Sequence, residues 1–138
     1  MNAAIKTSVM LLITVLLYSS PAASQLSPTT KKATQIKITE GPELELTKSD
    51  WAIVRWTSNN PGGSPEHYGI VHYGTDAKNL SETAKSPIRL NPNHSYTVFR
   101  VRVDGLKPRT TYYYTVASMG ANGDMDATHS SVKSFTTR

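Results

Sequence analysis

Short runs of alternating apolar and polar residues, separated by glycine, proline, asparagine and aspartate, make up the chain from residue 35 to residue 138. The alternation has the period of a half-buried β-strand, and no stretch sustains the spacing of an amphipathic helix. Because each strand must bury its apolar face, we expect an all-β fold of seven antiparallel strands in two stacked sheets. The expected strands are residues 36–46, 51–57, 67–73, 80–84, 95–103, 111–118 and 131–137, with residues 119–128 as a loop.

The first 24 residues differ in composition from the rest of the chain. Lys6 is the single charged residue before an apolar run of about ten residues, and small residues follow up to Ser24. This pattern predicts a secretory signal peptide over residues 1–24, cleaved before Gln25, with Ala22 and Ala23 as alternative last residues of the leader. The apolar run is about half as long as a membrane-spanning helix, so we expect no stable membrane insertion after cleavage. Residues 25–34 have little apolar content and predict a flexible linker.

Four residues mark a recognisable kind of β-sandwich. Pro108 sets a bend after Leu106, and Tyr112 begins the next strand, where its ring can enter the core while its hydroxyl bonds to upstream backbone. Trp56 stands late in the second expected strand, two residues after Val54. With these markers the chain resembles the fibronectin type III family, and the resemblance implies an immunoglobulin-like sandwich over residues 35–138.

Within that superfamily the chain is similar to the N-terminal domain of purple acid phosphatases. The residues that carry this likeness are 71–75 (Val-His-Tyr-Gly-Thr), 105–108, 112–116 and 134–137, and the similarity spans residues 36–138. In that family a separate α/β domain holds the two catalytic metals, and no ligand motif can be carried over onto this chain. The likeness therefore implies a non-catalytic domain without a metal or cofactor, related to the enzyme by ancestry or partnership.

Cysteine is absent and the net charge is +5, one unit of which belongs to Lys6 in the leader. A chain of this length can bury a core without disulfides. The lack of cysteine fits a bacterial periplasm or medium at least as well as an animal extracellular space, and it excludes lipid attachment after the leader. Asn79 and Asn93 begin Asn-x-Ser triplets, which would be glycosylated only in a eukaryotic secretory route.

We expect a secreted or periplasmic monomer whose partner is a protein or a cell-envelope polymer. We expect no nucleic-acid binding, because the basic residues form no concentrated patch.

Four histidines raise the question of a metal site. His67 and His72 are five residues apart in one expected strand, which puts them on opposite faces. Asn93-His94 is similar to a metallophosphatase ligand pair but lacks the glycine before it and the acid after it. We expect all four histidines, including His129, to be exposed residues at strand ends that bind no metal.

Acidic and serine residues offer no catalytic arrangement either. Asp124 and Asp126 lie near glycines in residues 120–126, but two carboxylates are too few for calcium and the EF-hand pattern is missing. Glu43 and Glu45 share one strand face, where acids blunt an edge strand. No Gly-x-Ser-x-Gly motif presents a serine nucleophile. The sequence therefore predicts no catalytic residue and no enzyme activity.

Strand alternation predicts one candidate interaction surface. If Trp56 faces the core, the odd-numbered residues of 51–55 and the even-numbered residues of 98–102 face outward. Tryptophan and arginine are enriched at contact surfaces, and an anionic polymer would also suit them. The alternative is that arginine stems lie along the apolar residues and cover them. The candidate surface consists of Trp51, Ile53, Arg55, Arg100 and Arg102, with Val98 beside them.

Two functions remain open from the sequence. The first is an exported, non-catalytic binding or scaffolding module that acts through this sheet face or through the loops at one end of the sandwich. The second is an accessory domain or remnant related to the N-terminal domain of purple acid phosphatases, which docks a metallophosphatase catalytic partner. A stand-alone hydrolase has the least support, because no nucleophile or metal constellation can be assembled.

Overall fold

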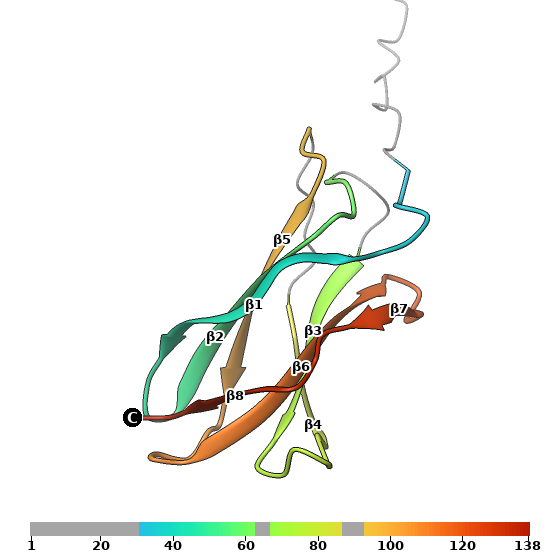
Figure 1. Ribbon diagram of the computed structural model, residues 1–138. Helices are drawn as coiled ribbons and strands as arrows, with labels where there is room; N and C mark the ends of the chain where they lie inside the picture. Colours follow the sequence, from blue (N-terminus) through green and yellow to red (C-terminus); the bar gives the residue numbers. More distant parts are fainter. Residues whose placement is uncertain (1–30, 63–66, 87–92) are drawn as a thin grey trace, which may run out of the picture.

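The computed structural model describes residues 31–62, 67–86 and 93–138, and they form two antiparallel β-sheets packed face to face (Figure 1). One sheet has three strands in the order β1-β2-β5. The other has five, in the order β4-β3-β6-β7, with β8 also paired to β6. The strands are β1 (Ile38–Thr47), β2 (Trp51–Ser58), β3 (His67–Gly74), β4 (Glu82–Lys85), β5 (Thr97–Asp104), β6 (Thr111–Gly120), β7 (Met125–His129) and β8 (Lys133–Thr136).

The predicted signal peptide and residues 25–30 of the predicted linker lie outside the described residues. Among the described ones, no helix is both long and apolar enough to cross a membrane. The described end of the linker contacts the sandwich: Lys32 pairs with Asp126, and the backbone N–H of Ala33 donates to Asn60 Oδ1 at 3.0 Å.

The predicted all-β, fibronectin type III-like sandwich is confirmed, because each sheet is antiparallel and the strand order matches that architecture. The described residues form eight strands, one more than the seven predicted. Residues 119–128, expected as a loop, contain β7, which pairs with β6 through Met119 opposite Met125 and Ala117 opposite His129. No residue of β7 is buried, so the strand has no apolar pattern that the sequence could show.

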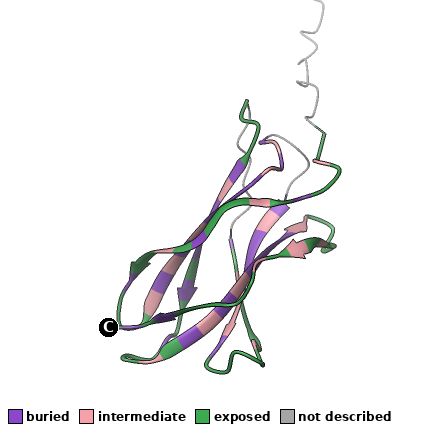
Figure 2. Cartoon of the chain, viewed as in Figure 1, coloured by how far each residue is buried: buried purple, intermediate pink, exposed green. Residues whose placement is uncertain are grey.

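The core lies between the sheets, and buried residues alternate with more exposed ones along the strands (Figure 2). Trp56 from β2 and Phe99 from β5 form its centre, with ring centroids 5.1 Å apart. Gly69 of β3 lies against both rings, because a Cβ placed there would come within 2.8 Å of each. Aliphatic side chains complete the inner faces around them: Ala52, Val54, Val71, Val101, Val103 and Val116.

Tyr112 closes the corner between β5 and β6. Its ring is 7% exposed and stacks on Phe135 at 5.8 Å, while its hydroxyl accepts a hydrogen bond from the backbone N–H of Lys107 at 2.9 Å. Leu106 is also buried, and its N–H donates to the carbonyl of Asp50 at 2.9 Å. The corner is therefore held by an aromatic ring on the inside and by backbone hydrogen bonds at its rim.

Replacing Tyr112 by phenylalanine is expected to lower the free energy of unfolding by about 1–2 kcal/mol, since it keeps the ring but leaves the Lys107 N–H without its acceptor. Urea denaturation measures the change. Tyr113→Phe is the matched control, because Tyr113 is half-buried at the next position of β6. Equal losses in the two variants would show that the hydroxyl of Tyr112 does not hold the corner.

Candidate functional site

The predicted surface residues lie on the outer face of the three-stranded sheet. β2 and β5 pair without a register shift, so Arg55 lies opposite Arg100 and Ile53 lies opposite Arg102. Arg100 and Arg102 are exposed, and Trp51, Ile53 and Arg55 of β2 are half-buried. The residues between them in both strands point inward and are buried, as the alternation predicts.

Each arginine of this face has a carboxylate partner. Arg55 Nη1 lies 3.1 Å from Glu43 Oε1. Arg100 binds Glu45 with two nitrogens, of which Nε donates to Oε2 at 2.7 Å. Glu43 and Glu45 therefore do more than line the edge of the sheet, because they bind arginines of β2 and β5.

Arg102 is held by two neighbours. Its Nε donates to Asp104 Oδ1 at 2.7 Å, and its guanidinium carbon lies 4.1 Å from the centre of the Trp51 ring. Trp51 is therefore partly covered by an arginine, while Ile53 lies opposite Leu46, which is 36% exposed. The end of the face at Trp51 thus combines apolar side chains with a guanidinium group that is held in place.

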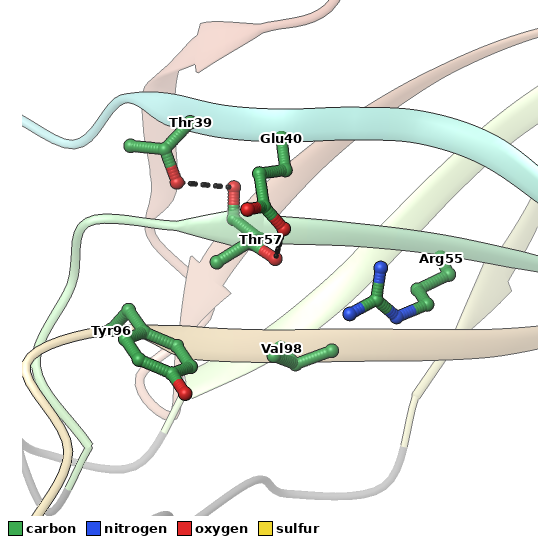
Figure 3. A pocket seen from close by; sticks show the side chains of 6 residues that line it. All are labelled: Thr39, Glu40, Arg55, Thr57, Tyr96 and Val98. Carbon is green, nitrogen blue, oxygen red and sulfur yellow. Dashed lines mark hydrogen bonds between the residues drawn. The ribbon is translucent and has the colours of Figure 1, made fainter.

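A pocket of about 310 Å³ opens at the other end of the same face (Figure 3). Figure 3 shows the Arg55 guanidinium and the Glu40 carboxylate beside the hydroxyl of Thr57, which donates to Glu40 Oε2 at 3.1 Å. Tyr96 is 43% exposed and presents its ring to the pocket. The lining residues are Thr39, Glu40, Arg55, Thr57, Tyr96 and Val98.

Sequence reasoning missed four of these lining residues: Thr39, Glu40, Thr57 and Tyr96. Tyr96 could have been predicted from the sequence. It lies two residues before Val98, so the alternation that turns Val98 and Arg100 outward turns Tyr96 outward as well. Thr39 and Glu40 carried none, since their places depend on register shifts between β1 and β2.

The histidines do not converge. His67 is 2% exposed, so the expectation that it is an exposed residue at a strand end is wrong. Its ring packs edge-on against Phe99 at 5.4 Å, and the amide nitrogen of Asn60 lies 3.4 Å from its Nε2. His72 lies at an outward position of β3 and is half-buried. Among the residues that the structure describes, no group of three or more His, Cys, Asp or Glu side chains could hold a metal.

Two core tyrosines are kept neutral. Burial raises the pKa of Tyr114, with the carboxylate of Glu43 as a second cause. Burial, followed by the charge of Glu82, raises the pKa of Tyr73 in the same direction. Both hydroxyls therefore hold their protons more tightly than a free tyrosine does, which suits residues of the core and its margin.

The sequence of the chain matches the model of one protein family. The model of the purple acid phosphatase N-terminal domain matches residues 39–137, which include all strands except the first residue of β1. The chain belongs to this family. The purple acid phosphatase N-terminal domain is non-catalytic. No curated protein matches the sequence.

Solved structures share the sandwich at low sequence identity. The long and short forms of the sensor domain of the anti-sigma factor RsgI4 from Pseudobacteroides cellulosolvens are 17% and 18% identical, with TM-scores of 0.51 and 0.50; the matches cover 75% and 76% of this chain and 89% and 96% of theirs. A fibronectin type III domain of human fibronectin type III domain containing protein 3 is 18% identical, with a TM-score of 0.46, covering 81% of this chain and 91% of that one. At such identities the likeness concerns the fold alone.

Proposed function

We propose that this purple acid phosphatase N-terminal domain is an exported, non-catalytic docking module that binds a partner protein through the outer face of β1, β2 and β5. The observation that carries the proposal is the set of arginines on this face, each held by a carboxylate beside the half-buried Trp51. Side chains that are already fixed lose little conformational entropy on binding. Arginine and tryptophan are also the residues that contribute most to protein interfaces.

The charge balance of the face favours a protein over an anionic polymer. The charges of Arg55, Arg100 and Arg102 are matched by those of Glu43, Glu45 and Asp104, and Glu40 adds a further negative charge. An anionic polymer needs surplus positive charge, which this face does not offer. A protein surface can present both signs of charge and an apolar side chain against Trp51 and Leu46.

Export rests on the leader sequence. Residues 1–24 have the charge, length and small residues of a signal peptide, and the described sandwich has no cysteine that an oxidising compartment would affect. The module would therefore act in the periplasm or outside the cell.

A metallophosphatase catalytic domain is the second, more specific candidate for the partner. The family match favours it, because the matched domain is the N-terminal domain of a family of phosphatases. In this version the domain would dock its partner and contribute no catalytic group.

The test compares binding by the exported form of the chain and its variants. The partner is captured from the envelope or culture fraction of the source organism, identified by mass spectrometry, purified and measured by interferometry. Trp51→Ala and Arg100→Ala are each expected to weaken binding by roughly tenfold or more. Lys78→Ala, which removes one positive charge from the turn between β3 and β4, is the matched control.

Circular dichroism checks that the variants fold. Unchanged affinity in both face variants, or an equal loss with Lys78→Ala, would reject the face as the docking surface. A metallophosphatase as the captured partner supports the second candidate, and a partner of another class rejects it.

A further inference from the structure

A second hollow, of about 390 Å³, lies at the seam between the two sheets, where the first half of β1 faces the connection between β7 and β8. Figure 1 shows these segments side by side, with β1 in cyan and β7 and β8 in red. This seam shares no lining residue with the pocket of Tyr96. It is therefore a separate site, independent of the docking face.

Hydrogen bonds across the seam fix its two walls. Lys133 Nζ donates to the carbonyl of Pro42 at 2.9 Å, and the hydroxyl of Thr128 donates to the carbonyl of Ile36. The hydroxyl of Ser130 accepts from the N–H of Val116 at 3.0 Å, which anchors the connection to β6. The hollow is thus formed by the fold itself, before any ligand enters.

The polar lining of the hollow is cationic and rich in hydrogen-bond donors. Lys37 comes from the approach to β1, His129 from the end of β7 and Lys133 from the start of β8, with Ser131 between the last two. An ammonium has three donors, so Lys133 keeps two after binding Pro42. None of the described residues that line the hollow is acidic.

Nearby carboxylates have partners elsewhere. Glu40, next to the lining residue Gly41, accepts from the hydroxyl of Thr57 on the outer face of the small sheet. Asp126, two residues before Thr128, binds Lys32 and the hydroxyl of Ser118. The positive charge of the hollow is therefore not neutralised by the acids of the strands that form it.

We propose that this seam binds an oxyanion, the phosphate, sulfate or carboxylate group of a ligand, through the ammonium groups of Lys37 and Lys133 and the hydroxyl of Ser131. Hydrogen bonds from charged donors to oxyanions are shorter and stronger than neutral ones. Lys37 stands directly before β1 and Lys133 lies in β8, so one anion bound to both would also join the two walls of the seam.

The test is a titration of the exported form of the chain, followed by NMR. Sodium phosphate, sodium sulfate and sodium acetate are each compared with sodium chloride at equal ionic strength. The amide signals of Ser131 and Lys133 are expected to shift and saturate with at least one oxyanion, while Asn79 in the β3–β4 turn does not respond. Signals that move equally with chloride would overturn the proposal, because ionic screening alone would then explain them.

Variants locate the site. Lys37→Gln is expected to weaken binding by roughly tenfold, the effect of one charge-assisted hydrogen bond, without changing the unfolding free energy, since no wall contact depends on it. Lys37→Gln with Lys133→Gln should abolish saturation. Lys78→Gln, of the same net charge as Lys37→Gln, should bind like the original chain. Equal affinity in Lys37→Gln and Lys78→Gln would overturn the proposal.

A last arm separates two sources of the anion. Tighter binding of a long polyphosphate chain than of inorganic phosphate, per phosphate group, would identify a polymer as the source of the oxyanion. Equal binding would identify a free small anion.

Discussion

Replacing Trp56 by alanine is expected to lower the free energy of unfolding by about 3–5 kcal/mol, a large part of the stability of a domain of this size. The ring is 1% exposed and lies at the centre of the core, 5.1 Å from the Phe99 ring. Alanine would leave a cavity between the sheets, because strands fixed by their hydrogen-bond ladders cannot collapse to fill it. Chemical denaturation followed by circular dichroism measures the loss.

Trp51→Ala is the control for this prediction. Trp51 belongs to the same strand but lies on the outer face, half-buried under Arg102. Its removal is expected to change the unfolding free energy by no more than about 1 kcal/mol, since only a partly exposed contact is lost. If Trp51→Ala cost as much as Trp56→Ala, the assignment of the two tryptophans to opposite faces would be wrong.

Replacing Gly69 by alanine is expected to lower the free energy of unfolding by about 1–3 kcal/mol through overpacking. A Cβ at this position would lie 2.8 Å from two ring atoms of Trp56 and 2.8 Å from Cδ1 of Phe99, distances that force the rings to move. The rings are in contact with each other and with other buried side chains, so the movement spreads through the core.

A double variant tests the mechanism. In a Phe99→Leu background one of the two rings that the new methyl group meets is gone, so Gly69→Ala should cost less than it does in the original chain. Thermal and urea denaturation of the four proteins give the coupling energy. Additive losses would show that contact with Phe99 does not cause the effect.

Most strands of the fold are readable from the sequence because they have one buried face. β5 alternates between buried and outward residues along its whole length, and β2 does so from Trp51 to Trp56, which makes both their position and their orientation predictable. β7 could not be found in this way. Its residues are exposed or half-buried, and it is positioned by pairing with β6 and by the bond between Thr128 and Ile36, contacts between residues distant in sequence.

The candidate site was only partly predictable. Alternation along β2 and β5 gave the outward residues, but not the carboxylates that bind the arginines. Two of those carboxylates come from β1, whose pairing with β2 shifts register at three places: Glu43 binds Arg55 of the neighbouring strand, and Glu45 reaches Arg100 across β2. Register shifts depend on the local backbone and leave no periodic signal. The burial of His67 was missed because a polar residue at an inward position needs a partner that the sequence does not reveal.

The irregular pairing of β1 with β2 makes this outer strand less able to pair with a second copy of the chain. A regular outer strand offers unpaired backbone groups on which another chain can lay a strand and start a fibril. In β1 the ladder is irregular, Pro42 has no N–H to offer, and the carbonyl of Pro42 is already occupied by Lys133. This border of the smaller sheet is therefore a poor template for amyloid-like growth, which matters in a sandwich that has no disulfide to restrain its strands.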